Sequence, residues 1–280
     1  MQSGAIRPLN NMLPRNLFNA EHEAFRETVR KFYAKEVVPN IEKYEQQQHV
    51  DRELWNKAGT MGLLCATMPE AYGGSGVDRL YSMILIEEQA YAMDSSTGFS
   101  LHSDIVANYI NNFGNEEQKK HWIPKMVSGE AVTAIAMTEP GTGSDLQAVR
   151  TTAVLEGDEY IINGSKIFIT NGYLCDMAIV VCKTGDSDKG SANLSLILVE
   201  ADRAGFSKGK PLNKIGMKGQ DTCELFFEDV RVPKENLLGT QGMGFFMLMQ
   251  ELAWERMLVA IICQAGAEAA FAHTVQYTKD

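Results

Sequence analysis

The segment AMTEPGTGSD, residues 136–145, decides the fold, because it joins an apolar, strand-like run to a polar turn that contains glycine. Gly141 and Gly143 are expected to permit backbone geometry that a side chain would forbid. The segment also carries hydroxyl groups that can hydrogen-bond a polar ring or a phosphate ester, on Thr138, Thr142 and Ser144. It therefore predicts a site for a flat heterocyclic ligand at the end of a strand.

Two familiar phosphate-binding patterns fit this segment poorly. A dinucleotide fingerprint needs a third glycine where Leu146 stands, and an apolar helix should follow it at once. A P-loop needs Lys and then Ser or Thr after its last glycine, and this order is absent. Taken alone, such a turn is more often a plain loop, so its interpretation depends on the rest of the chain.

The composition is that of an ordinary globular protein with two or three domains. The 280 residues are 45% hydrophobic and 22% charged, and this length exceeds that of one typical domain. A formal net charge of −10 argues against nucleic acid as a partner but leaves a small anionic ligand open. The five histidines lack metal-ligand spacing, so we expect no metal site.

Cysteine usage points to an intracellular protein. The five cysteines are odd in number, scattered, and without a Cys-x-x-Cys pair, which is typical of reduced thiols. No apolar run is judged long enough to span a membrane, so we expect no membrane association. Residues 1–20 hold two arginines and no acid. We therefore predict a cytoplasmic protein, or one of the mitochondrial matrix if a leader was removed.

Three parts follow one another, and we place them at residues 1–130, 131–239 and 240–280. Apolar periodicity in the first part predicts helices over residues 21–38, 55–64, 79–92 and 104–113. A further helix should begin at the N-cap Asn115 and end at Gly129.

The middle part has the pattern of short strands. Runs rich in β-branched and apolar residues lie around residue 154 and at 160–162, 166–170, 178–182, 194–199 and 222–232. Turn residues separate them at 157–158, 163–164, 171–172 and 185–186. This spacing predicts a small antiparallel barrel or sandwich.

The last part reads as one apolar helix that two charges interrupt. Such a helix, apolar on nearly every face, is expected to be buried in the core or between subunits. Glu255 and Arg256 stand inside it, and burying an ionisable group is costly unless it is paired or functional. Glu255 is therefore a candidate active-site carboxylate, Glu251 one turn earlier is its rival, and a simple ion pair with another helix stays open.

Three segments together resemble the acyl-CoA dehydrogenases. Residues 136–145 are similar to that family's first signature, and KIFITNG at 166–172 to its second flavin-contacting segment. The pattern Asp-Thr-x-Glu-Leu-x-Phe-x-Asp-x-x-Val-Pro, at 221–233, resembles the strand that closes the family's β-domain. The resemblance begins near residue 18, and Glu255 in its Glu-Arg context resembles the long-chain and isovaleryl branch.

The resemblance implies an α+β fold with an N-terminal helical domain, a middle β-domain and the start of a C-terminal helical bundle. It implies FAD as cofactor, α,β-desaturation of a fatty acyl-CoA to the trans-2-enoyl-CoA, electron-transfer flavoprotein as acceptor, and a homotetramer. Glu255 would take the α-proton. Flavin contacts would come from Ile135, Ala136, Met137, Thr138, Gly143, Ser144, Phe168, Ile169 and Thr170. Substrate contacts would come from Ser144, Ser191, Phe246, Ala253, Trp254 and Arg256.

The sequence departs from the family pattern at its end, since Asp280 stands inside a stretch that still reads as helix. Family members continue through most of a C-terminal bundle, which supplies an arginine for the flavin pyrophosphate and the adenine pocket. We therefore expect that this chain is a fragment. The alternative from another class is a catalytically incompetent binding or assembly subunit of the same fold. An acyl-CoA oxidase is an alternative of the same enzyme class.

Overall fold

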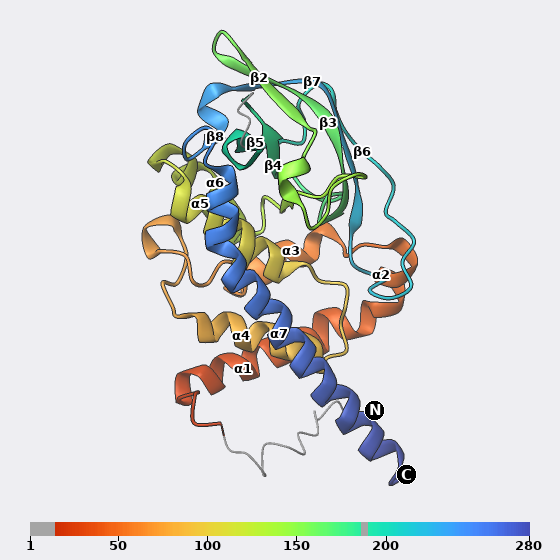
Figure 1. The fold of residues 1–280 in the computed structure, drawn as a ribbon. Helices are drawn as coiled ribbons and strands as arrows, with labels where there is room; N and C mark the ends of the chain where they lie inside the picture. Colours follow the sequence, from red (N-terminus) through yellow and green to blue (C-terminus); the bar gives the residue numbers. More distant parts are fainter. Residues whose placement is uncertain (1–14, 186–189) are drawn as a thin grey trace.

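The N-terminal part is helical, as predicted. The computed structural model describes residues 15–185 and 190–280. The prediction of cellular location was drawn from residues 1–20, most of which are outside the described residues. In Figure 1, α1 to α4 lie below the strands, and α5 and α6 lie beside the lower part of the sheet. Their bounds are α1 Ala20–Phe32, α2 Ile41–Gln47, α3 Arg52–Thr60, α4 Arg79–Tyr91, α5 Ala107–Phe113 and α6 Glu116–Ser128.

Two predicted helices have irregular ends. The helix expected over 21–38 stops being α-helical after Phe32 and continues as a π turn, Tyr33–Val37, and a 3₁₀ turn, Val38–Asn40. Pro39 explains this, because its ring would clash with the carbonyl four residues earlier in a regular α-helix. The helix expected over 104–113 likewise opens with a π turn, Leu101–Val106. At α6 the prediction is confirmed, since Asn115 forms a capping box with Gln118.

The middle part forms one sheet in the order β6-β7-β3-β2-β4-β5-β8, with β1 paired to β4. Most neighbours are antiparallel, as predicted, but β1 and a single pair of β2 run parallel to β4. The bounds are β1 Thr133–Ala136, β2 Thr152–Glu156, β3 Glu159–Thr170, β4 Met177–Lys183, β5 Leu194–Glu200, β6 Phe206–Lys208, β7 Thr222–Pro233 and β8 Leu237–Leu238.

Asn163-Gly164 is not a turn, contrary to the sequence prediction. β3 runs through it as one long strand with a register shift against β7 between Ile162 and Gly164. Gly164 has a φ of 150°, and a Cβ there would lie 2.5 Å from Thr151 Oγ1. Glycine is thus needed for close packing inside a bulged strand rather than for chain reversal. The turn at 157–158 is confirmed as the β2–β3 connection, whereas Asp186 lies outside the described residues.

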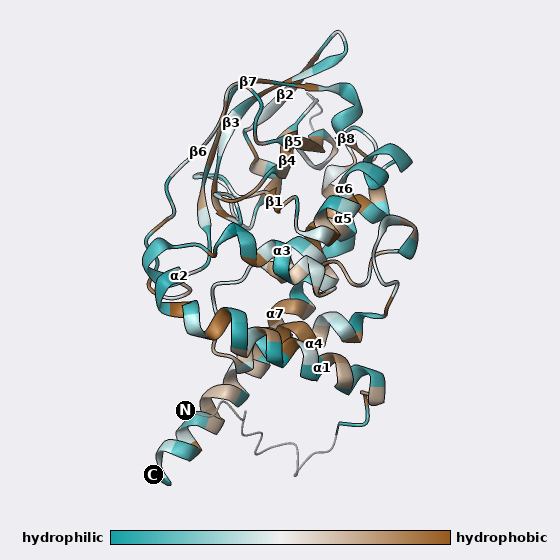
Figure 2. Ribbon diagram, turned by 180° about the vertical axis from the view of Figure 1, so that it is seen from behind, coloured by the Kyte–Doolittle hydropathy of each residue, from teal (hydrophilic) through white to brown (hydrophobic). Residues whose placement is uncertain are grey.

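The two faces of β4 belong to different cores. Met177, Ile179 and Val181 pack with the helices α5 and α6, whereas Ala178, Val180 and Cys182 pack with residues of β3 and β7. Because successive side chains of a strand point to opposite faces, this unbroken apolar strand is buried on both. Figure 2 shows the apolar colouring gathered on these central strands and on inner helix faces. The sheet is therefore held against the helical layer by β4.

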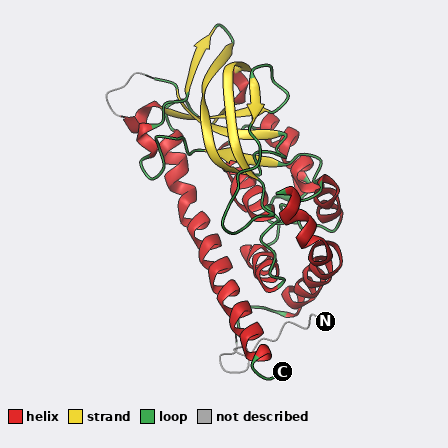
Figure 3. Ribbon diagram, turned by 90° about the vertical axis from the view of Figure 1, so that its right-hand side faces the viewer, coloured by secondary structure: helices red, strands yellow, loops and turns green. Residues whose placement is uncertain are grey.

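The helix α7, Gly244–Tyr277, leaves the sheet and runs along the helical layer (Figure 3). Leu258 and Ile261 pack with Ile86 of α4. On the other side Val259 is 61% exposed and Phe271 50%, so α7 is not buried in the core on every face; the predicted burial between subunits stays a prediction.

The expectation that no apolar run reaches spanning length is also wrong. An 18-residue window of α7 is long and apolar enough to cross a membrane, with 28% of it buried. Length and composition are weak grounds for a membrane span, because core helices of other proteins meet the same criteria.

Candidate functional site

The structure brings the two predicted flavin-contacting segments side by side. β1 ends at Ala136, and the chain then passes Ile167 of β3, whose amide donates to Thr138 O at 2.9 Å. Three of the predicted contact residues have buried side chains, so only their backbone can meet a ligand: Ile135, Ala136 and Ile169. Three others are partly exposed: Met137, Thr138 and Thr170. We call residues 135–138 with 168–170 the cradle.

The turn after the cradle holds its own backbone and leaves its outer surface open. Glu139 and Thr142 exchange two backbone hydrogen bonds of 2.9 and 3.0 Å. The Thr142 hydroxyl donates to Ala148 O, so it is committed to the turn and not to a ligand. Ser144 is exposed.

The predicted reason for the glycines in this turn is wrong. Neither Gly141 nor Gly143 has a positive φ, and a Cβ at either position would meet nothing within 4 Å. These glycines are therefore not required by backbone strain. What they provide is an open surface above the backbone next to the cradle.

Phe168 is the most unusual residue of the cradle. Its φ is 61°, a value that bulky residues rarely adopt, and its side chain is 63% exposed. A register shift of β3 against β7 between Lys166 and Ile169 produces this geometry. A strained, exposed aromatic residue is an observation that suggests function, because burial does not stabilise its conformation.

Glu255 is half-buried on α7, and its carboxylate is held by one tyrosine. Tyr109 of α5 donates its hydroxyl to Glu255 Oε1 at 2.8 Å. Burial raises the pKa of Glu255 above its usual value; the Tyr109 hydrogen bond opposes this and the nearby Glu251 charge adds to it. The arrangement gives a partly accessible carboxylate with increased basicity, which suits proton abstraction.

The rival carboxylate is less accessible. Glu251 is only 5% exposed, and its Oε1 accepts a 2.8 Å hydrogen bond from Asn112 Nδ2. Sequence reasoning missed both Asn112 and Tyr109. Their only signal was that two polar side chains three residues apart face the same side of a helix.

One helical segment, 101–113, connects the base to the cradle. At its end Tyr109 reaches Glu255, and near its start His102 Nδ1 accepts from Thr133 N at 3.2 Å, where β1 begins. Burial lowers the pKa of His102 to about 4, so the ring is neutral and its Nε2–H donates to Met126 O at 3.0 Å. Both ring nitrogens are thus occupied in fixing the segment against the sheet.

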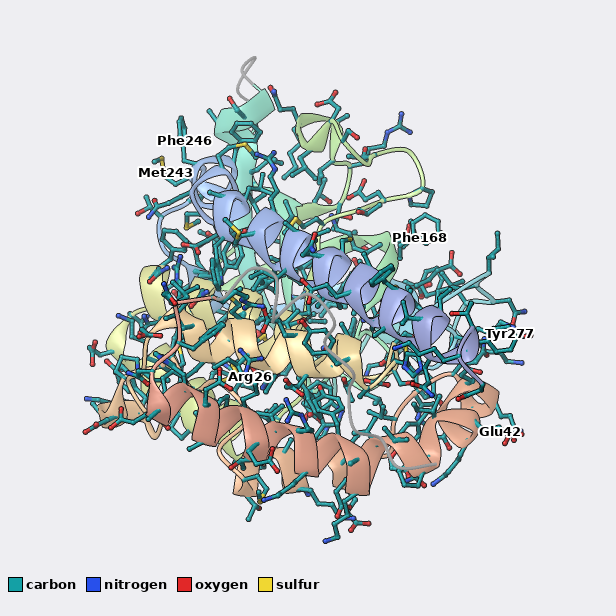
Figure 4. All side chains as sticks on the ribbon, turned by 90° about the horizontal axis from the view of Figure 1, so that it is seen from below. Arg26, Glu42, Phe168, Met243, Phe246 and Tyr277 are labelled. Atoms are coloured by element: carbon teal, nitrogen blue, oxygen red, sulfur yellow. The ribbon has the colours of Figure 1, made fainter. Side chains whose placement is uncertain are left out.

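The predicted substrate residues are spread over a wider area. Ala253, Arg256 and Phe246 are exposed on α7, and Ser191 lies in the turn Gly190–Asn193. Trp254 is half-buried with the Arg79 guanidinium 4.4 Å from its ring centroid. Figure 4 shows Phe246 at the first turn of α7, well separated from Phe168.

Other features of the described residues do not compete with this site. Within residues 15–185 and 190–280, no three His, Cys, Asp or Glu side chains are grouped to hold a metal ion. An open depression of about 570 Å³ lies between α6 and the sheet and contains none of the predicted site residues. Lys125 and Lys208 line it together with Asp176, Glu200 and Asp202, so it carries charges of both signs.

Comparisons with known proteins agree with the architecture. Residues 19–130 match the acyl-CoA dehydrogenase N-terminal domain and residues 134–230 the acyl-CoA dehydrogenase middle domain. The chain is 50% identical over 280 residues to the long-chain specific acyl-CoA dehydrogenase, mitochondrial, of Sus scrofa, covering all of this chain and 65% of that protein.

Two solved structures are similar as well. The acyl-CoA dehydrogenase of Geobacillus kaustophilus has a TM-score of 0.92 and 47% identity, with 94% of this chain and 69% of that chain covered. The acyl-CoA dehydrogenase of Bacillus anthracis, described as complexed with FAD, has a TM-score of 0.84 and 37% identity, with 91% and 44% covered. The chain thus spans about two thirds of the length of the Sus scrofa and Geobacillus kaustophilus proteins.

Proposed function

The chain belongs to the acyl-CoA dehydrogenase family, and we propose that it carries the flavin cradle and the base of an FAD-dependent enzyme that desaturates fatty acyl-CoA thioesters. We keep the division into an N-terminal helical domain, 1–130, a β-domain, 131–239, and the start of a helical bundle, 240–280, as part of this proposal. Because the chain spans 65% of the length of its pig relative, the enzymatic activity is part of this proposal.

The cradle residues fit an isoalloxazine ring. The exposed Phe168 side chain supplies an aromatic face, and the open backbone at Gly143 allows close approach. Thr138 and Thr170 supply hydroxyl and backbone groups at the polar edge of the ring, and Ser144 faces the thioester. FAD, when bound there, supplies the acceptor for the hydride that leaves the β-carbon of the substrate.

The observation that carries the proposal is the half-buried carboxylate of Glu255 with its bond to Tyr109. Glu255 removes the α-proton of the thioester, and its raised pKa brings its basicity closer to that of the acidified carbon acid. Glu251 is less suited, since it is buried and bonded to Asn112. Ser191, Phe246, Ala253, Trp254 and Arg256 are proposed to line the path of the acyl-CoA.

Three finer points belong to the same proposal and rest on the family resemblance. The product is the trans-2-enoyl-CoA, the electrons pass to an electron-transfer flavoprotein, and the assembled form is a homotetramer. Since the pig relative is mitochondrial, the mitochondrial matrix stands beside the cytoplasm as a proposed location.

Anaerobic titration with acyl-CoA tests the proposal. The full-length protein loaded with FAD should lose its flavin absorbance when a medium- or long-chain acyl-CoA is added. Glu255→Gln should keep the flavin but not be bleached, whereas the matched variant Glu251→Gln should still be bleached. Bleaching retained in Glu255→Gln and lost in Glu251→Gln would assign the base to Glu251. A wild-type protein that binds FAD but is never bleached would favour the binding-subunit alternative.

A further inference from the structure

A fully buried lysine lies directly beside the cradle. The Lys166 side chain has no exposed surface, and its Nζ donates to Glu139 Oε1 at 2.9 Å and to Met137 O at 3.0 Å. Lys166 precedes the exposed Phe168 on β3, whereas Met137 belongs to the other half of the cradle. One ammonium group therefore joins the two halves.

Glu139 completes a network in which the buried charges are matched. Besides Lys166, its carboxylate accepts from the backbone amides of Arg150 at 2.7 Å and Thr151 at 2.9 Å. Burial raises the pKa of Glu139, but these hydrogen bonds and the Lys166 charge outweigh it, so this pKa lies below its usual value. Burial lowers the pKa of Lys166, and the hydrogen bond and charge of Glu139 oppose that change. The carboxylate thus fixes the turn that follows the cradle as well as the lysine.

The network sits at the point where β3 departs from regular pairing. Lys166 pairs with Leu225 and Ile169 with Cys223, so two residues of β3 lie opposite one residue of β7, which is a β-bulge. Within this bulge the Ile167 amide turns away from β7 and donates to Thr138 O. The bulge is what leaves Phe168 exposed with a positive φ.

Stability alone is a poor explanation for this arrangement. A buried ion pair often contributes little net stability compared with apolar residues of similar volume, and its better-supported use is to specify one arrangement among several. Here the arrangement that it specifies is the relative position of the Met137–Thr138 backbone and the Phe168 ring.

We propose that the buried Lys166–Glu139 pair positions the two halves of the cradle for the edge and face of the flavin ring. This inference rests on the proposed function, because it takes the cradle to be the flavin site. Lys166 and Glu139 are positioning residues: they act through Met137, Thr138 and Phe168 and do not themselves touch the ring.

The test replaces both charges at once, so that neither is left buried without its partner. In Glu139→Gln with Lys166→Met we expect a folded protein whose dissociation constant for FAD rises at least about tenfold, with a changed visible spectrum of the bound flavin. Hydrogen exchange of the Ile167 amide in the flavin-free protein should also become faster. The matched control is Arg26→Met with Glu87→Gln, a buried pair between α1 and α4 with an N–O distance of 2.7 Å; Arg26 is labelled in Figure 4. Glu88, which Arg26 also contacts, keeps its ion pair with Arg30.

The control should lower thermal stability but leave FAD affinity, the flavin spectrum and Ile167 exchange unchanged. An FAD dissociation constant and spectrum of the Lys166–Glu139 double variant that match wild type would overturn the inference while leaving the proposed function intact. An equal loss of FAD affinity in the control would also overturn it, because the effect would then be general destabilisation. Failure of wild-type protein to bind FAD would overturn both.

Discussion

Replacing Asp104 by asparagine should stabilise the protein at neutral pH, and this gain should shrink in acid. Asp104 is 4% exposed in the π turn Leu101–Val106, where it accepts a hydrogen bond from Ser82 Oγ of α4. Burial raises its pKa from 3.8 to about 7; the Ser82 bond and the Arg79 charge oppose the rise only in part. The asparagine side chain would resemble the protonated acid in shape and would carry no charge to desolvate.

The magnitude follows from proton linkage. Between the unfolded pKa of 3.8 and the folded pKa of about 7, the folded state binds more protons than the unfolded state, so stability falls as pH rises. Above the folded pKa, ionised Asp104 lowers the free energy of unfolding by its full amount, about 4 kcal/mol. Near pH 5 the free energy of unfolding is lowered by only about 2 kcal/mol.

Urea unfolding of wild type and Asp104→Asn between about pH 5 and pH 8 measures this difference. The free energy of unfolding of the variant should exceed that of wild type by an amount that grows with pH and then levels off. Asp158→Asn is the control: Lys234 lowers the pKa of this exposed carboxyl, so its removal should give a small loss at neutral pH. A difference between Asp104→Asn and wild type that is the same at every pH would refute the reasoning.

The remaining predictions concern the base and two glycines, Gly59 in α3 and Gly141 in the turn after the cradle. Tyr109→Phe removes the hydrogen bond that favours the ionised carboxylate of Glu255, so the acidic limb of the kcat/KM profile should move to higher pH by about one unit; an unmoved limb would contradict this. Gly59→Ala should lower the free energy of unfolding by about 1–3 kcal/mol, since its Cβ would lie 2.2 Å from Ser128 O. Gly141→Ala, which meets nothing within 4 Å, should leave thermal stability unchanged; equal Tm values for the two alanine variants would show that the Gly59 contact does not matter.

Local signals predicted most of the secondary structure and failed where a residue served a distant neighbour. The Asn115 cap was predictable because it acts within three residues. The turn predicted at Asn163-Gly164 was wrong because the same dipeptide suits both a tight turn and a bulge. Glycine is needed there because Thr151, on another segment, packs against it. The pattern of α7 left burial in the core and burial between subunits both open, because periodicity reports apolar character and not what covers it.

The family, the order of helices and strands, and Glu255 as a candidate base could be predicted from the amino-acid sequence, because they depend on short motifs and on neighbours within a few residues. The side chains that hold the site in place became visible only in the folded chain. Tyr109 meets Glu255 across 146 positions, and Lys166 meets Glu139 across 27. Such partners leave no local pattern, since their proximity arises from the packing of β1 against β3 and of α5 against α7.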